Sequence, residues 1–228
     1  MTGLFLQARM ASSRFPGKAL EEIGNRTILE HCMAALGYVR ADYHVLLTDE
    51  HSRDTFRIQA RQWGFDLFAG SEDDVLDRFA RACEHYEVDT IVRATADNPL
   101  VSASLANAIL AEHRSVRADY SGYLGMPIGT GVEVLSAEAL MQADAHADST
   151  YEREHVSPYI YHHRERYRTH RPTVEPSIQN NSRVTIDTPE DLRHVQRIFA
   201  RLYRGTPIEI EELVRELRGH AQHHKQSA

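Results

Sequence analysis

Lysine, cysteine and long apolar runs are scarce in this sequence of 228 residues. Lys18 and Lys225 are the only lysines among 26 basic residues. Cys32 and Cys83 both lie in amphipathic, helix-like patterns, which favours buried free thiols in a reducing cytosol over a disulfide or a redox pair. No apolar run approaches the roughly 18 residues of a membrane helix, and the apolar start at 1–6 is too short for a signal peptide. We therefore expect a cytoplasmic protein with no membrane partner.

Acidic residues outnumber basic ones by 33 to 26, which gives a formal net charge of −7. This balance argues against a general nucleic-acid coat and against a polybasic membrane binder. The first 20 residues depart from it, because they hold Arg9, Arg14 and Lys18 and no acid. That stretch is a candidate contact for an anion. The 14 histidines include no H-E-x-x-H pair, so their spacing predicts no zinc site.

Short apolar runs alternate with helical patterns, which predicts an α/β sheet. The expected strands are 4–6, 44–47, 66–68, 90–94, 119–126, 131–135 and 184–186. The expected helices are 28–36, 53–63, 75–86, 105–113, 151–161, 190–203 and 209–218. The polar stretch 162–181, with two prolines, suits an extended arm or loop. We predict a single domain over 1–218, built from halves at about 1–118 and 119–218, and a disordered tail over 219–228.

The segment Gln7–Lys18 follows the first expected strand and leads towards a helix. Its small residues let the backbone approach a ligand, and its three cations could neutralise a polyphosphate. It is not a P-loop, because G-x-x-x-x-G-K-[ST] is absent. Gly129-Thr130-Gly131 is no Rossmann fingerprint either, since it lacks a third glycine and precedes a strand. The alternative interpretation of the segment is a solvated basic loop.

Asp97 and Asp187 each follow an expected strand, and in each case a proline stands two positions later. Ligands of open α/β sheets bind at the carboxyl ends of strands, where both aspartates would lie. Two carboxylates from different strands suit a hard Mg²⁺ ion that also binds substrate phosphates. Asp187 has an alternative role, because Thr188 and Pro189 match the N-cap and first position of a helix.

Two charged blocks are ambiguous on their own. In 70–78, Ser71 can cap a helix whose first turn carries acids, or the turn can recognise a base or ribose. In 151–155, Arg153 and His155 could hold an anionic acceptor, or the block could be a surface helix with internal ion pairs.

Taken together, these blocks resemble the cytidylyltransferases related to CMP-sugar-acid synthetases, and most of all their spore-coat polysaccharide (SpsF-type) branch. The resemblance spans about residues 4–203. It rests on several blocks in the same order: Gln7-Ala8-Arg9, Arg14-Phe15-Pro16-Gly17-Lys18, Gly70–Arg78, Asp97-Asn98-Pro99-Leu100, Val132-Glu133-Val134, Tyr151–Val156 and Asp187–Asp191.

The resemblance implies a Rossmann-like nucleotidyltransferase fold with a mixed, mostly parallel central sheet, a small extended arm and usually a homodimer. It implies CTP as donor, a nucleotide-binding first half, a second half for acceptor binding and dimerisation, and Mg²⁺ at Asp97 and Asp187. Lys18, Arg9 and Arg14 would act on the triphosphate and carry catalysis, and the base would lie near 69–71. The implied nucleotide-binding residues are Gln7, Ala8, Arg9, Ser13, Arg14, Lys18, Ala69, Gly70, Ser71, Asp74, Arg78, Thr95, Ala96 and Asp97.

One departure from the family bears on the acceptor. Many SpsF-like chains have Pro-Asp-Gly-Leu-Asp before the Val-Glu-Val strand, whereas this chain has an uncharged loop at 127–131. A loop without acids tolerates extra negative charge, so we favour a phosphate or phosphonate acceptor over a sugar-acid hydroxyl. The predicted acceptor-binding residues are Gly129, Thr130, Gly131, Glu133, Arg153 and His155. A sugar-transferring enzyme, which would need an Asp-x-Asp motif, and a non-catalytic nucleotide sensor are the remaining alternatives.

Overall fold

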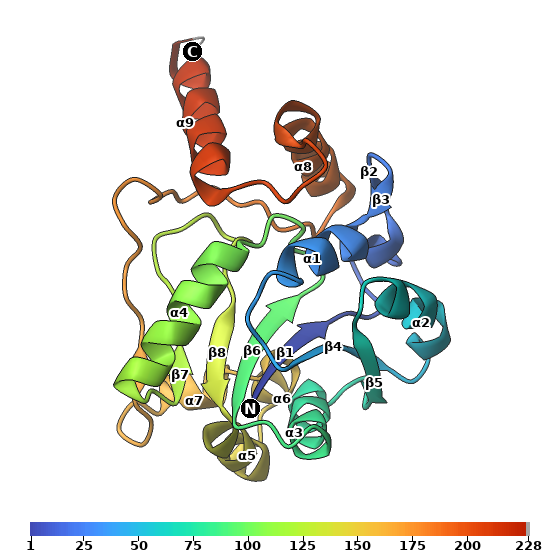
Figure 1. Ribbon diagram of the computed structural model, residues 1–228, viewed down its shortest axis with the longest axis vertical. Coiled ribbons are helices and arrows are strands. Elements are labelled where there is room, and N and C mark those ends of the chain that lie inside the picture. Colours follow the sequence, from blue (N-terminus) through green and yellow to red (C-terminus); the bar gives the residue numbers. More distant parts are fainter. Residues whose placement is uncertain (227–228) are drawn as a thin grey trace.

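The computed structural model describes residues 1–226, with side chains for residues 1–219. Seven strands of this part form one sheet, ordered β5-β4-β1-β6-β8-β7-β9 (Figure 1). The first four run parallel to one another: β5 (Asp66–Gly70), β4 (Tyr43–Asp49), β1 (Thr2–Gln7) and β6 (Thr90–Thr95). The other three are β8 (Glu133–Ser136), β7 (Tyr120–Ser121) and β9 (Thr169–His170). Strand β8 is antiparallel to both β6 and β7, and β9 is parallel to β7. The predicted mixed, mostly parallel sheet is confirmed.

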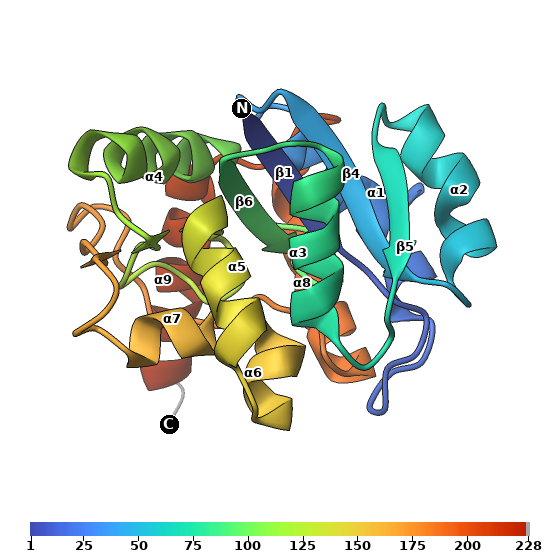
Figure 2. The same ribbon diagram turned by 90° about the horizontal axis from the view of Figure 1, so that it is seen from below.

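Helices cover both faces of the sheet (Figure 2). One face carries α1 (Ile28–Leu36), α2 (Arg53–Gln62), α4 (Ala103–Val116), α8 (Pro189–Leu202) and α9 (Ile210–Gln226). The other carries α3 (Val75–His85), α5 (Ala137–His146) and α7 (Pro158–His162), with α6 (Thr150–His155) beside α3. Strand alternation divides the core accordingly, because Leu4 and Leu6 pack on the first face and Phe5 packs on the second. A separate hairpin joins β2 (Glu22–Ile23) to β3 (Arg26–Thr27).

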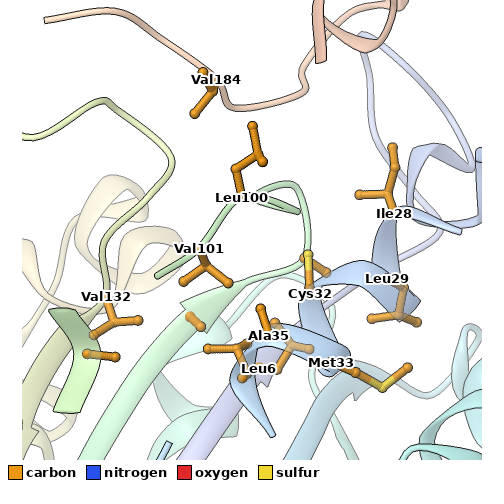
Figure 3. Packing of buried hydrophobic residues seen from close by; sticks show 14 of the residues in the cluster. Leu6, Ile28, Leu29, Cys32, Met33, Ala35, Leu100, Val101, Val132 and Val184 are labelled. Carbon is orange, nitrogen blue, oxygen red and sulfur yellow. The ribbon is translucent and has the colours of Figure 1, made fainter. Parts of the chain in front are cut away.

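The two cysteines are free and buried, as predicted. Cys32, on α1, lies among apolar side chains that include Leu6, Leu100 and Val184 (Figure 3). Burial raises the pKa of both thiols, and that of Cys83 to about 11, so both stay protonated at neutral pH. They act as core residues.

Three predicted elements differ from the structure. The expected helix 151–161 is two helices, since Val156 between α6 and α7 has φ 71°, outside helical space. The expected strand 184–186 does not pair as a strand, because its segment meets the 124–128 loop only through the isolated bridge of Ile128 to Arg183. The expected strand 119–126 is reduced to β7, beyond which the chain stays beside 170–174 only through the isolated bridge of Leu124 to Thr173.

Helix α5 was not anticipated, because its buried face consists of Ala139, Leu140 and Ala143, a weak apolar stripe. The helix expected at 209–218 continues through most of the tail that we predicted to be disordered, since α9 ends at Gln226. Leu217 is the last buried residue of α9 among those whose side chains are described, and adding residues to an existing helix requires no new nucleation. Positions 227 and 228 of that predicted tail lie outside the described residues.

Across residues 1–226, none of the helices has the combination of length and apolar composition that crossing a bilayer requires.

Candidate active site

The loop after β1 is folded back by hydrogen bonds of its own backbone. Met10 N donates to Ser52 Oγ over 3.0 Å, and Gly17 N donates to the Met10 carbonyl over 2.9 Å. Gly17 has φ 73°, which favours glycine, and it starts the 3-10 turn η1 (Lys18–Leu20). The turn leaves the Lys18 side chain only 15% exposed, directed at the carboxyl edge of the sheet.

The Lys18 ammonium group joins two carboxylates that are distant in sequence. Its Nζ lies 3.1 Å from Asp97 Oδ2 and 3.0 Å from Asp187 Oδ1, and it donates to the Ile186 carbonyl over 2.7 Å. Thr95 Oγ1 at the end of β6 donates to Asp97 Oδ1 over 2.7 Å, which orients that carboxylate. Ile186 N donates to the Asp97 carbonyl over 2.9 Å, and this bond draws the two segments together.

Asp187 is surrounded by cations. Arg14 Nη2 lies 3.1 Å from its Oδ1, and Arg183 donates to its Oδ2. Burial alone would raise the pKa of Asp187, but the hydrogen bond and charge of Lys18, with the two arginines, hold that pKa below its ordinary value. The carboxylate is therefore ionised at neutral pH.

The helix start that competed for Asp187 is present as well. Thr188 caps α8 in a capping box with Asp191, and Pro189 occupies the first turn. Asp191 Oδ2 also accepts from Asp187 N over 3.0 Å. The cap fixes the backbone of Asp187, while its side chain is left to face Lys18, so the two interpretations of this residue are compatible.

A cavity of about 300 Å³ lies over the Lys18 cluster. It brings together eleven of the predicted site residues: Gln7, Ala8, Arg9, Ser13, Arg14, Lys18, Thr95, Ala96, Asp97, His155 and Asp187. Glu154 of α6 closes one side, since its Oε1 pairs with Arg9 Nη2 at 3.2 Å. The cavity thus combines cations, carboxylates and closely approaching backbone.

A second cavity of about 390 Å³ adjoins the first, and Arg93 and Thr95 line both. Its wall is the 122–133 segment, which contributes Gly129, Gly131 and Glu133 of the predicted acceptor residues. Thr130 differs from expectation, because it is fully buried and its hydroxyl donates to the Pro127 carbonyl inside the loop.

Gly129 could not be another residue without rearrangement. Its φ is 102°, and a Cβ there would come 2.8 Å from Thr185 N and 3.0 Å from Asn98 Oδ1. The loop therefore approaches the segment before Asp187 more closely than a side chain would allow.

Arg93 stands between the cavities and was missed by the sequence analysis. It is opposite Glu133 in the β6–β8 register, and its Nη1 donates to Glu133 Oε2 over 2.5 Å. Tyr120 and Ser157 also donate to Glu133, over 2.9 Å each. The charge of the Glu133 carboxylate is thereby balanced by Arg93, and these bonds hold the wall of the second cavity in place. In the sequence, the signal for this role was an arginine inside an expected strand.

The residues predicted around the base lie outside the lining of both cavities in the described part of the chain: Ala69, Gly70, Ser71, Asp74 and Arg78. The predicted Ser71 cap is wrong, because Asp74 is the N-cap of α3 and Ser71 Oγ accepts from Asp74 N instead. Arg78 is fully buried below Gly70 and donates to the Ser71 carbonyl over 2.8 Å.

Arg153 also lies outside both linings of the described residues. Its guanidinium donates to Asp74 at 2.5–2.9 Å and to Asp144 Oδ1 at 2.7 Å. Arg153 is thus held by ion pairs, although these reach Asp74 and Asp144 of other segments and are not internal to α6 as the alternative expected, while its neighbour His155 lines the first cavity. The expected contact of Arg153 with an acceptor is not what the structure shows, because two carboxylates already satisfy this cation.

Asp49 and Ser52, both buried, were missed too. Asp49 ends β4 and accepts from Ser52 N over 2.8 Å and Ser52 Oγ over 2.7 Å. Burial alone would raise the pKa of Asp49, but the Ser52 hydrogen bonds and the charge of Arg78 outweigh it and hold that pKa below its ordinary value. The group is therefore ionised at neutral pH. Burial in turn lowers the pKa of Arg78 to about 10, against the opposing charge of Asp49. Asp49 thus offsets the charge of the buried arginine and, through Ser52, holds Met10 of the loop after β1.

Comparisons with known proteins show the family and the fold of this chain. Residues 4–221 match the model of a family described as cytidylyltransferase. The spore coat polysaccharide biosynthesis protein SpsF of Bacillus subtilis is 30% identical, over 92% of this chain and 90% of its own. A cytidylyltransferase structure from Leptospira borgpetersenii has a TM-score of 0.88 at 25% identity, covering 97% of this chain and 95% of that one.

A structure of CMP:2-keto-3-deoxy-manno-octonic acid synthetase complexed with CTP shares the fold, with a TM-score of 0.68 at 14% identity. It covers 87% of this chain and 98% of that one. The fold is therefore that of nucleotidyltransferases, and the chain belongs to the cytidylyltransferase family.

Proposed function

We propose that this protein transfers CMP from CTP to a small anionic acceptor and releases pyrophosphate. The convergence of Lys18, Asp97 and Asp187 beside the arginine-bearing loop carries the proposal. Phosphoryl transfer needs cations on the phosphates and carboxylates for a divalent ion, and this cavity supplies both. Membership in the cytidylyltransferase family supports CTP as the donor.

Mg²⁺ is the ion that we propose for the carboxylate pair. Asp97 and Asp187 offer hard oxygen ligands that already enclose one cation, the Lys18 ammonium. Among the described residues, no group of three or more His, Cys, Asp or Glu side chains could hold a metal ion. Two carboxylates suit Mg²⁺, which keeps waters and substrate phosphates as its other ligands. When bound, the ion would neutralise charge on the phosphates.

The residues of the chain position the reactants. Arg9, Arg14 and Lys18 bind the triphosphate and stabilise the charge that develops on the leaving pyrophosphate. An acceptor oxygen in the second cavity attacks the α-phosphorus in line, so one P–O bond forms as the bond to pyrophosphate breaks. Arg93, which lines both cavities, orients the acceptor. A phosphate or phosphonate oxygen is already anionic and requires no general base.

The second cavity supports a phosphate- or phosphonate-bearing acceptor. Its 124–131 wall carries no acid, and the carboxylate of Glu133 is matched by Arg93. Arg153 lends no support, because its cation is held by Asp74 and Asp144.

A sugar acid that reacts through a hydroxyl is the second candidate. The SpsF relative is named for polysaccharide biosynthesis, and Tyr123 and Asn98 of the second cavity offer polar groups for hydroxyl contacts. A hydroxyl nucleophile must lose a proton, and His155, which lines the first cavity, is suited to accept it.

The test is pyrophosphate release by the full chain with Mg²⁺ and each of the four ribonucleoside triphosphates. Phosphomonoesters, phosphonates and 2-keto sugar acids are supplied as acceptors. We expect release from CTP with a phosphomonoester or phosphonate, and loss of release in Lys18→Ala but not in the surface control Arg57→Met. Release only with a sugar acid would select the second candidate. CTP binding without turnover on any acceptor would contradict both.

A further inference from the structure

Three cations face two carboxylates at the first cavity. Lys18 contacts Asp97 and Asp187, and Arg14 and Arg183 each contact Asp187. Both oxygens of Asp187 are engaged, Oδ1 by Lys18 and Arg14 and Oδ2 by Arg183. A divalent ion that binds Asp187 must therefore displace positive charge from it.

Arg183 belongs to no predicted site, yet its backbone is anchored to the second cavity. It forms an isolated parallel bridge with Ile128, which lines that cavity. The hydrogen bonds on either side are Ile128 N to the Ser182 carbonyl, at 2.9 Å, and Val184 N to the Ile128 carbonyl, at 2.8 Å. Its side chain, 46% exposed, extends to Asp187 at the first cavity.

We propose that Arg183 is a positioning residue that, together with Lys18, closes the Asp97–Asp187 pair to divalent ions until a nucleoside triphosphate draws these cations away. This proposal rests on the proposed function. The cations and a divalent ion compete for the same oxygens and repel each other at such short range. A triphosphate offers them a new partner, so nucleotide and metal bind with positive coupling, and each raises the affinity for the other.

The difference between the two cations is their freedom to move. Lys18 is 15% exposed and fixed by three acceptors, whereas the Arg183 side chain is half exposed. Arg183 can leave Asp187 with its backbone still bonded to Ile128. Its release therefore opens the metal position without disturbing the wall of the second cavity.

The test measures Mn²⁺ binding to the full chain without nucleotide, by the electron paramagnetic resonance signal of free Mn²⁺. We expect weak binding to the wild type and binding tighter by about tenfold or more in Arg183→Met, because one charge at contact distance is removed. Arg183→Lys, which keeps the charge, is expected to bind as the wild type does. Arg57→Met, which removes an exposed charge paired with Asp54, controls for net charge.

Adding Asp187→Asn to Arg183→Met is expected to restore weak binding, which places the ion at Asp187. The proposal is overturned if Arg183→Met binds Mn²⁺ no more tightly than Arg57→Met. It is also overturned if Arg183→Lys tightens binding equally, or if Asp187→Asn leaves the gained affinity intact. Failure of the proposed function is a separate result: the wild type would then release no pyrophosphate from CTP with any of the acceptors.

Discussion

Ser52 holds the loop after β1 through its hydroxyl group, and removing this contact should affect both stability and the loop. Ser52→Ala deletes the hydroxyl that accepts from Met10 N at 3.0 Å and donates to Asp49 Oδ2 at 2.7 Å. Ser52 and Asp49 are both 2% exposed, so water does not readily replace the lost bonds. A hydrogen bond to a charged group and an N–H left without its partner together cost about 2–4 kcal/mol.

For a chain of this length, that loss lowers the melting temperature by roughly 5–15 °C. Asp49 has a lowered pKa in the folded protein, so its stabilisation is present above the ordinary value of 3.8 and is lost as the pH falls through the folded value. The difference in melting temperature between variant and wild type should therefore be at its full size at pH 7 and become smaller below about pH 4. Differential scanning calorimetry across this range measures it.

The same substitution frees the loop that carries Arg9, Arg14 and Lys18, so the KM for CTP should rise. Ser136→Ala is the matched control, because it removes the N-cap of α5 and costs about 1 kcal/mol at a helix outside both cavities. We expect it to lower the melting temperature without changing that KM. Equal KM values for CTP in the two variants would refute the role of Ser52 in positioning the loop.

Three further predictions concern single residues. Lys18→Ala should lower kcat about 10²–10³-fold while circular dichroism remains that of the wild type, since one preorganised charge is lost; a near-normal kcat would remove Lys18 from the mechanism. Gly129→Ala should destabilise the protein more than Gly205→Ala, as measured by urea unfolding, because both have positive φ but only Gly129 would meet neighbouring backbone. Burial lowers the pKa of His113 to about 4, so stability should fall by up to about 3 kcal/mol as the pH drops from 6.5 towards 4. His113→Gln should flatten that dependence; an unchanged pH profile would contradict it.

The sequence predicts those parts of the site that depend on strand ends. Asp97 was expected at the carboxyl edge because it follows an expected strand, and the structure places it there beside Lys18. Asp187 reaches the same point without the expected strand, through the capped start of α8 and the bond from Ile186 N. The position was therefore anticipated, although the element that delivers it was not.

Partners distant in the chain could not be predicted. Arg153 looked available for an acceptor because its own segment does not reveal Asp74, 79 positions earlier, as its partner. The break at Val156 was hidden for the same reason, because a valine with φ 71° is tolerated only where surrounding packing enforces it. A sequence pattern reflects the local preferences of its residues, whereas these two features arise from tertiary contacts.

Because β8 runs antiparallel to β6, the two cavities are built from different ends of neighbouring strands. The first cavity is built on the carboxyl ends of β1 and β6, where Lys18 joins Asp97 to Asp187. The wall of the second cavity is the segment that enters β8 at its amino end, and it is held against the segment before Asp187 at Gly129. Substitution of its exposed side chains, such as Leu124 and Ile128, can thus change the lining of the second cavity while the Gly129 contact and the first cavity stay in place.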